Sequence, residues 1–300
     1  FLKVQQGEIQ STHISIDEIR GKYALADDEK CSRQKKYQQE PLLKIKNLNT
    51  WFPVKSGFFQ PEKEPVKAVH NISFEVFPGE TLGLVGESGC GKTTLGRSII
   101  RLIEPTSGKI SFKNQDILTL PPNEMRRMRK KMQLIFQDPY SSLNPKQSVG
   151  EAIFEPMTVH QLFTNPQQRK KKVLQLLDRV GLLPEHFNRY PHEFSGGQRQ
   201  RIVIARALAL QPEFLICDES VSALDVSVQA QVLNLLKDLQ QEFNLTYLFI
   251  SHDLAVVKHL SDRVMVMNKG EIIEIGDPET IYHHPKQAYT QKLIASIPKQ

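Results

Sequence analysis

Long apolar runs, cysteine and tryptophan are scarce in this sequence. No uninterrupted apolar stretch approaches the roughly 18 residues that a membrane-spanning helix needs, so we expect a soluble chain. The three cysteines, Cys31, Cys90 and Cys217, are too few and too scattered for a disulfide framework or a cysteine metal site. They fit a reducing cytoplasm. The interpretation we favour for Cys90 and Cys217 is that both fill small spaces.

Charge of one sign is only moderately in excess, with 39 Lys and Arg against 33 Asp and Glu and a net charge of +6. Two basic runs, residues 126–131 and 169–172, fall in polar helical stretches and are interpreted as solvated faces. A nucleic-acid site would need aromatic residues between the charges or a known module, and the sequence has neither. We therefore expect no nucleic-acid partner.

The sequence divides near residue 40. Residues 1–40 are polar, and they are expected to form a linker or tail with at most a short helix over residues 14–19. Residue 1 is Phe and not Met, so we expect a piece cut from a longer protein. From residue 42 onward, apolar residues recur with clear periodicity, and 300 residues suffice for one large domain or a domain with a subdomain.

Between residues 139 and 212 strand signals vanish, which predicts an all-helical insert, at about residues 140–211, inside an α/β chain. No internal repeat is visible. Apolar or alternating runs predict strands at residues 43–48, 69–76, 81–85, 109–112, 133–136, 214–217, 246–250, 264–267 and 271–275. Helical periodicity predicts helices at residues 95–103, 149–154, 166–180, 195–210 and 226–243.

Residues 86–94, GESGCGKTT, match the phosphate-binding loop pattern G-x-x-x-x-G-K-[ST], between an expected strand and an expected helix. Glycines let the loop turn its N–H groups onto phosphate oxygens, and the helix N-terminus adds partial positive charge. Lys92 is predicted to reach the β- and γ-phosphates and Thr93 to hold Mg²⁺. The residues predicted to bind the nucleotide here are Gly86, Ser88, Gly89, Cys90, Gly91, Lys92, Thr93 and Thr94.

The strand at residues 214–217 delivers two acids, Asp218 and Glu219, to the carboxyl edge of the sheet. An acid placed there is the second half of a phosphate-loop nucleotide site, and Asp218 is predicted to bind Mg²⁺ or its water. Glu219 can then orient or deprotonate the attacking water. Without the phosphate loop, the pair would be interpreted as a solvated acidic turn.

Residues 195–198, Ser-Gly-Gly-Gln, open the expected helix at 195–210. Ser195 can cap that helix, and the two glycines keep side chains away from its positive end, which makes an anion-binding surface. Alone, this motif would indicate only a loop that leads into a helix.

Together these motifs resemble the nucleotide-binding subunit of ABC transporters over residues 42–298. The shared order is the phosphate loop, Gln137, residues 194–198, residues 215–219, residues 222–225 and His252. The resemblance implies an α/β fold, a P-loop NTPase (RecA-like) core with an antiparallel β subdomain, an all-helical insert and a short C-terminal extension at about residues 276–298. It also implies ATP hydrolysis with Mg²⁺.

The resemblance further implies a head-to-tail dimer, in which ATP on one phosphate loop is covered by the partner's signature helix. Asp225 matches the loop that couples the two sites. The residues implied to act across the dimer are Ser195, Gly196, Gly197, Gln198 and Asp225.

The resemblance also implies roles for single residues. Gln137 matches the lid glutamine that senses Mg²⁺ and the attacking water, and His252 matches the switch histidine that contacts the γ-phosphate. Lys92, Glu219, Gln137 and His252 form the implied catalytic set. Phe52 aligns with the aromatic residue that stacks on adenine, and the adjacent Trp51 stays an alternative.

Two departures, Ser220-Val221 after Glu219 and Phe194 before Ser195, remove no group that the chemistry uses. Residues 137–145, 189–194 and 223–236 resemble the oligopeptide, dipeptide and nickel importer branch, and residues 281–298 resemble its C-terminal extension, with Gln287-Ala288 in place of His-Pro. The tail has no cysteine, so no iron–sulfur cluster is expected.

The expected protein is therefore an ATPase subunit at the cytoplasmic face of the cell membrane. Its expected partners are a second ATP-binding subunit, transmembrane permease subunits, and indirectly a solute-binding protein. A fusion of the second ATP-binding subunit before residue 1 is a hypothesis. Peptides, nickel and glutathione all remain open as solutes. The alternatives are an ABC-type ATPase acting on ribosomes or nucleic acid, and a nucleotide-gated structural module without turnover.

Overall fold

The computed structural model describes residues 2–5, 8–11, 37–54, 63–222 and 224–296. The chain forms two compact units, residues 1–40 and 41–300. The first contains an antiparallel hairpin of β1 (Leu2–Gln5) and β2 (Glu8–Ser11), where the sequence predicted only a polar linker or tail. The helix expected over residues 14–19, and Cys31, lie outside the described residues.

The second unit is organised around a six-stranded sheet with the strand order β12-β11-β5-β10-β9-β8. Five neighbouring strands are parallel and β12 is antiparallel. Every residue of β5, β9 and β10 is buried, as expected for parallel strands covered on both faces. The strands are β5 (Thr81–Val85), β8 (Met132–Ile135), β9 (Phe214–Asp218), β10 (Thr246–Ile250), β11 (Arg263–Asn268) and β12 (Glu271–Gly276).

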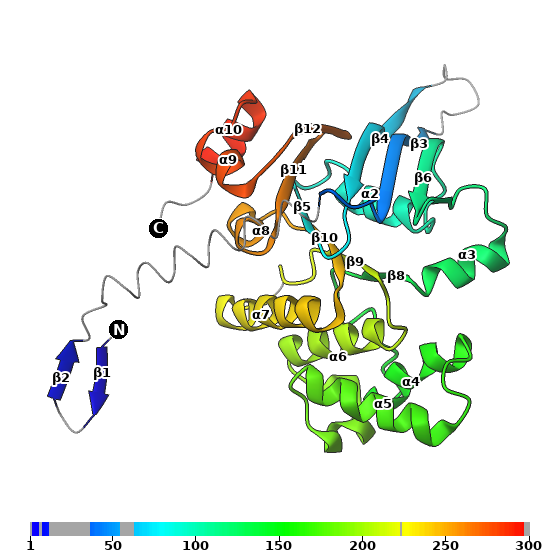
Figure 1. The fold of residues 1–300 in the computed structure, drawn as a ribbon, viewed down its shortest axis with the longest axis vertical. Coiled ribbons are helices and arrows are strands. Elements are labelled where there is room, and N and C mark those ends of the chain that lie inside the picture. The colour runs from blue at the N-terminus through cyan, green and yellow to red at the C-terminus, as the bar shows by residue number, and fades with distance from the viewer. Residues whose placement is uncertain (1, 6–7, 12–36, 55–62, 223, 297–300) are drawn as a thin grey trace. The chain divides into compact units, whose positions relative to one another are not determined.

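The two faces of this sheet bury two different apolar clusters. On β9, Phe214 and Ile216 join one cluster, whereas Leu215 and Cys217 join the other. The first cluster contains α2 (Lys92–Ile99) and the four-stranded antiparallel sheet, and the second contains the helical insert. Figure 1 shows α4, α5 and α6 gathered apart from strands β3, β4 and β6.

The remaining elements complete these two layers. The antiparallel sheet consists of β3 (Leu43–Val54), β4 (Lys63–Val76), β6 (Ser107–Phe112) and β7 (Gln115–Asp116), and α3 (Pro122–Arg129) follows it. The helices of the other layer and of the C-terminal extension are α4 (Val149–Val159), α5 (Pro166–Arg179), α6 (Gly196–Leu208), α7 (Val226–Phe243), α8 (Leu254–Leu260), α9 (Pro278–His283) and α10 (Ala288–Ala295). Two short 3₁₀ turns, Pro184–Asn188 and Pro191–Glu193, lead into α6.

The predicted fold class is confirmed, with element boundaries that differ in places. Helix α4 begins at Val149 as predicted, where Ser148 and Glu151 form a capping box, but it runs past Pro156 to Val159. Strand β4 begins at Lys63, six residues earlier than predicted. No described helix combines the length and apolar character that crossing a membrane would require.

An ion pair joins the residue before β5 to the start of the neighbouring strand β11. Glu80 is fully buried, and Arg263 of β11 donates from Nε to Glu80 Oε1 at 2.6 Å. The backbone N–H of Phe77 donates to Oε2 at 2.8 Å. Burial raises the pKa of Glu80, and the bond from Arg263 opposes that rise. The guanidinium therefore favours the ionised form of this buried carboxyl group.

Replacing Arg263 with Met is expected to lower the free energy of unfolding at neutral pH by about 3 kcal/mol, because an uncompensated carboxyl remains buried. Without Arg263 the folded pKa of Glu80 rises further above its unfolded value. The deficit should therefore shrink as pH falls toward the unfolded pKa. Urea unfolding of the wild-type and Arg263→Met chains at pH 5 and 7.5 measures this difference in unfolding free energy. In a chain that already carries Glu80→Gln, Arg263→Met should lower the unfolding free energy by an amount that does not depend on pH. If the loss depends on pH as strongly as in the chain with Glu80, then Glu80 does not cause the pH dependence.

Candidate nucleotide-binding site

The loop between β5 and α2 is shaped by neighbouring backbone. Gly91 has φ 110°, and a Cβ atom there would lie 2.0 Å from the carbonyl oxygen of Ala68 on β4. At Gly86 a Cβ atom would lie 2.2 Å from the carbonyl oxygen of Met267 on β11. No other residue fits either position, so β4 and β11 fix the curl of the loop from two sides. Ser88 and Gly89 are exposed in this loop, Cys90 is buried, and Thr94 lies in the first turn of α2.

Lys92 lies inside the curl of this loop. Its Nζ atom donates to the carbonyl oxygens of Gly86 at 2.8 Å and Glu87 at 2.9 Å. The same ammonium is 3.8 Å from Glu219 Oε1, and only 3% of the Lys92 side chain is exposed. A buried cation is thus held at the helix N-terminus, where an anion would meet it.

Thr93 and Asp218 bring two oxygens together at the end of β9. Thr93 Oγ1 donates to Asp218 Oδ1 at 3.0 Å. Burial raises the pKa of Asp218, while the Thr93 bond and the Arg97 charge lower it. No group of three or more His, Cys, Asp or Glu side chains gathers as metal ligands within the described residues. This donor set fits Mg²⁺, which takes one or two protein oxygens and completes its shell with water and substrate phosphates.

Glu219 is the centre of a second group of contacts. Gln137 Nε2 donates to Glu219 Oε2 at 2.9 Å, and His252 Nδ1 lies 3.7 Å from the same oxygen. The backbone N–H of Glu219 donates to the carbonyl oxygen of Ile250 at 2.9 Å. Glu219 adopts φ 47°, a left-handed conformation that costs a non-glycine residue about 1–3 kcal/mol and is found at functional sites.

These contacts share one location for a topological reason. The phosphate loop follows β5, Gln137 follows β8, Glu219 follows β9 and His252 follows β10. Since these four strands are parallel, their carboxyl ends meet at one edge, which is where open α/β sheets bind ligands.

Among the described residues, the hydrogen bonds and close approaches of the Ser195 motif do not include the residues of this edge. Ser195 Oγ accepts the Gln198 N–H at 3.3 Å, and Gln198 Oε1 accepts the Ser195 N–H at 3.0 Å, which caps α6. However, α6 packs in the apolar cluster on the face of the sheet opposite to α2. Gly196 opens α6, with Leu224 Cδ2 at 3.5 Å from where its Cβ would be.

Two positions near α7 have structural roles as well. A Cβ atom on Gly197 would lie 2.3 Å from Val228 Cγ1, so this glycine lets α6 and α7 approach each other. This packing role was not predicted. Asp225 occupies the N-cap position of α7 without a side-chain capping bond.

The two adenine candidates differ in their surroundings. The ring of Trp51 lies 5.8 Å from the ring of His70 and 5.4 Å from the Lys67 ammonium. Phe52 is 40% exposed and pairs with Val66 on β4, two residues before Ala68 at the phosphate loop. These surroundings favour Phe52, whose stacking on adenine stays a prediction.

Two further contacts to the loop went unrecognised in the sequence. The backbone N–H of Gly270 donates to the carbonyl oxygen of Cys90 at 2.9 Å, and the N–H of Glu87 donates to Tyr289 Oη at 3.2 Å. Gly270 lies in the turn between two strands that the sequence predicted, at residues 264–267 and 271–275. Nothing in the tail sequence indicated that Tyr289 reaches the loop.

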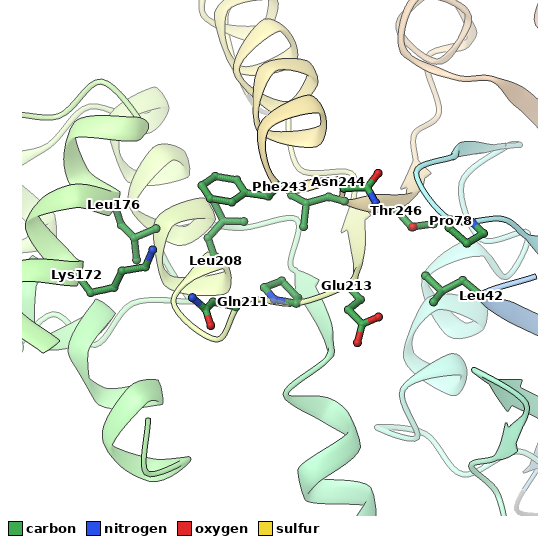
Figure 2. A pocket seen from close by; sticks show the side chains of 12 residues that line it. Leu42, Pro78, Lys172, Leu176, Leu208, Gln211, Glu213, Phe243, Asn244 and Thr246 are labelled. Carbon is green, nitrogen blue, oxygen red and sulfur yellow. The ribbon is translucent and has the colours of Figure 1, made fainter. Parts of the chain in front are cut away.

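A further pocket lies away from this site. It has a volume of about 330 Å³ and is lined by side chains that include Leu176, Leu208 and Phe243 (Figure 2). Glu213 and Thr246, at the amino ends of β9 and β10, also line it. None of the predicted site residues does, so this pocket is separate from the site at the carboxyl edge.

Comparison with known proteins identifies the relatives of this chain. The ABC transporter family profile matches residues 69–222. The oligopeptide transport ATP-binding protein AppF of Bacillus subtilis (strain 168) is 55% identical over 261 residues, which are 87% of this chain and 79% of AppF. The glutathione import ATP-binding protein GsiA of Escherichia coli (strain K12) is 54% identical over 86% of this chain, but the match spans only 41% of GsiA.

The solved structures that resemble this chain are also ATP-binding cassettes or parts of ABC transporters. The ATP-binding cassette MJ0796, described as a dimer in a post-hydrolysis state with ADP and phosphate, is 28% identical with a TM-score of 0.69. The match covers 79% of this chain and 98% of that one. CbiO1 from Clostridium perfringens, described as part of the ABC transporter complex cbiONQ, is 26% identical with a TM-score of 0.70, over 87% of this chain and 97% of that one. The chain belongs to the ABC transporter family and is one of its ATP-binding, ATP-hydrolysing subunits.

Proposed function

We propose that this chain drives import of a peptide-type solute by hydrolysing ATP between two ATP-binding units arranged head to tail. The observation that carries the proposal is the separation of the two anion-binding helix ends. Helix α2 begins at the phosphate loop, and α6 begins at Ser195 on the opposite face of the sheet. A second unit is then needed to bring a Ser195 end to a phosphate loop.

The N-terminus of α6 is suited to that role. Glycines at 196 and 197 leave its first N–H groups without side-chain cover, and the helix adds partial positive charge. MJ0796, which is similar to this chain, is described as a dimer with ADP and phosphate. We infer that Ser195, Gly197 and Gln198 contact the γ-phosphate of ATP held by the partner, with Asp225 near the same interface.

The residues at the carboxyl edge divide the chemistry. Lys92 exchanges its contacts with the loop carbonyls for phosphate oxygens. Thr93 and Asp218, with Gln137 nearby, would hold Mg²⁺, which supplies charge neutralisation at the phosphoryl oxygens when bound. Glu219 accepts the proton of the attacking water or orients it. Gln137 and His252, both next to Glu219 Oε2, hold that carboxylate in position.

A groove beside this site is suited to a permease. It has a volume of about 350 Å³ and lies between β8, α4 and α6. Phe136, Val159 and Leu210 give it an apolar lining, and His160 and Arg206 add polar groups. Phe136 directly precedes Gln137, so movement of the groove would reach the catalytic edge. We propose that a short cytoplasmic helix of a permease subunit occupies it, with the chain bound peripherally at the cytoplasmic membrane face.

The solute is proposed from the relatives. The name of AppF specifies oligopeptide transport and that of GsiA glutathione import. AppF is matched over 79% of its length and GsiA over 41%, so we propose an oligopeptide. A solute-binding protein would take part through the permease.

An uptake assay tests this function. Cells whose own copy carries Lys92→Ala are expected to lose uptake of a labelled tetrapeptide to background and to keep uptake of labelled glutathione. Lys172→Ala, in α5 beside the separate pocket, serves as the matched control and should retain both. Unchanged peptide uptake in the Lys92→Ala cells would contradict the proposed solute, and unchanged uptake of both would contradict the importer.

A further inference from the structure

Tyr289 connects the C-terminal extension to the phosphate loop. It lies in the first turn of α10, and its Oη atom accepts the backbone N–H of Glu87 at 3.2 Å, across 202 residues of sequence. The carbonyl oxygen of Glu87 accepts the ammonium of Lys92 at 2.9 Å. A single loop residue is thus held from outside by Tyr289 and from inside by the cation that meets the phosphates.

Helix α10 holds Tyr289 firmly in place. Glu274 of β12 accepts the backbone N–H groups of Lys286 at 3.0 Å and Gln287 at 3.2 Å, just before the helix. Thr290, the next residue after Tyr289, is fully buried. The ring of Tyr289 packs against the apolar cluster of the helical face. The hydroxyl therefore has a defined position and does not depend on a free tail.

The hairpin of β11 and β12 also contacts the phosphate loop. Gly270, in the turn between β11 and β12, donates its N–H to the carbonyl oxygen of Cys90 at 2.9 Å. Strand β12 leads from Gly270 to Glu274, and Glu274 holds the start of α10. The phosphate loop is therefore held at two points. Helix α10 contacts it at Glu87, and the β11–β12 hairpin contacts it at Cys90.

We propose that Tyr289 is a positioning residue for ATP binding, whose hydroxyl holds the Glu87 peptide so that the loop keeps its curl when Lys92 turns to the phosphates. The inference rests on the ATPase function proposed above. Once Lys92 leaves the carbonyls of Gly86 and Glu87, the loop loses two internal hydrogen bonds. The Tyr289 bond remains, so the loop gains less conformational freedom when Lys92 turns to the phosphates, and less of it has to be removed for ATP to bind.

Coupling of this kind acts in both directions. If docking of α10 favours the ATP-binding form of the loop, ATP must favour docking of α10 by the same free energy. Bound ATP should therefore slow amide hydrogen exchange over Ala288–Ala295.

Tyr289→Phe removes only the hydroxyl and tests the proposal in the full chain. The lost bond should weaken MgATP binding by about 3–10-fold, while kcat at saturating ATP changes by less than about twofold. Titration calorimetry and steady-state hydrolysis give the two numbers. Exchange at the Glu87 amide should also become faster. Tyr282→Phe is the matched control, because this tyrosine of α9 packs under the Lys258 ammonium at 4.3 Å and should keep wild-type affinity.

Glu274→Gln supplies a second, independent variant. It weakens the anchor of α10, so it should also lower MgATP affinity. In the double variant with Tyr289→Phe, the total loss of affinity should be smaller than the sum of the two single losses. Wild-type affinity in Tyr289→Phe, or an equal loss in Tyr282→Phe, overturns the positioning role. A wild-type chain that fails to bind MgATP would instead overturn the proposed function itself.

Discussion

Replacing Glu219 with glutamine should cut ATP hydrolysis by about 10²–10⁴-fold, the range for losing general-base assistance. Glutamine keeps the size and the hydrogen bond to Gln137 but cannot take a proton. MgATP binding should persist, because Lys92 and Thr93 are untouched. With hydrolysis blocked, the variant should accumulate as an ATP-bound dimer. Phosphate release and size-exclusion chromatography with MgATP measure the two effects.

Glu213→Gln is the matched control for this substitution. Glu213 directly precedes β9, at the other end of the strand from Glu219, and pairs with Lys113. Its loss removes one carboxylate without touching the carboxyl edge, so turnover should stay near wild type. Turnover near wild type in Glu219→Gln would instead remove Glu219 from the chemistry.

The site at the carboxyl edge could be predicted because its residues follow strands directly. Lys92 and Asp218 each lie within seven residues of a buried apolar run that the sequence marks clearly. Parallel strands bring their carboxyl ends to one edge, so identifying the strands was enough to group the side chains. Gln137 and His252 also follow predicted strands, at residues 133–136 and 246–250, but their roles were assigned only through the family resemblance.

Contacts between distant elements could not be predicted in the same way. Periodicity shows which face of an element is buried, but not which element covers it. The ion pair of Glu80 and Arg263 and the bond from Glu87 to Tyr289 join residues 183 and 202 positions apart. The close approach of Gly197 to Val228 was missed for another reason. The sequence already explained Gly197 as part of an anion-binding helix end, so no packing role was looked for.

Short elements were also missed. Helix α8 has seven residues and β7 has two, too few for a period of 3.6 or 2 to stand out. The β1–β2 hairpin lies in a polar segment whose composition favoured a linker. In β7 and in the β1–β2 hairpin the backbone pairing, and not an apolar pattern, defines the element.

Replacing Ser195 with arginine should abolish the ATP-bound dimer of the Glu219→Gln chain and leave its affinity for MgATP unchanged. A long cation at the start of α6 removes the hydroxyl and fills the space that a partner's phosphate would need. In the otherwise wild-type chain, hydrolysis should fall by about 10²–10³-fold, the usual loss when a donor to transition-state charge is removed. Size-exclusion chromatography, calorimetry and phosphate release report dimer, affinity and turnover.

Ser148→Arg provides the matched control, because Ser148 caps α4 with the same type of capping box. Both substitutions lose a cap worth about 1 kcal/mol of stability, but only Ser195 begins the signature helix. The ATP-bound dimer should therefore survive Ser148→Arg. If Ser195→Arg weakened MgATP binding by the single chain, α6 would serve its own phosphate loop and the head-to-tail arrangement would be wrong. Because α2 and α6 lie on opposite faces of one sheet, we expect the dimer to be lost while that affinity is kept.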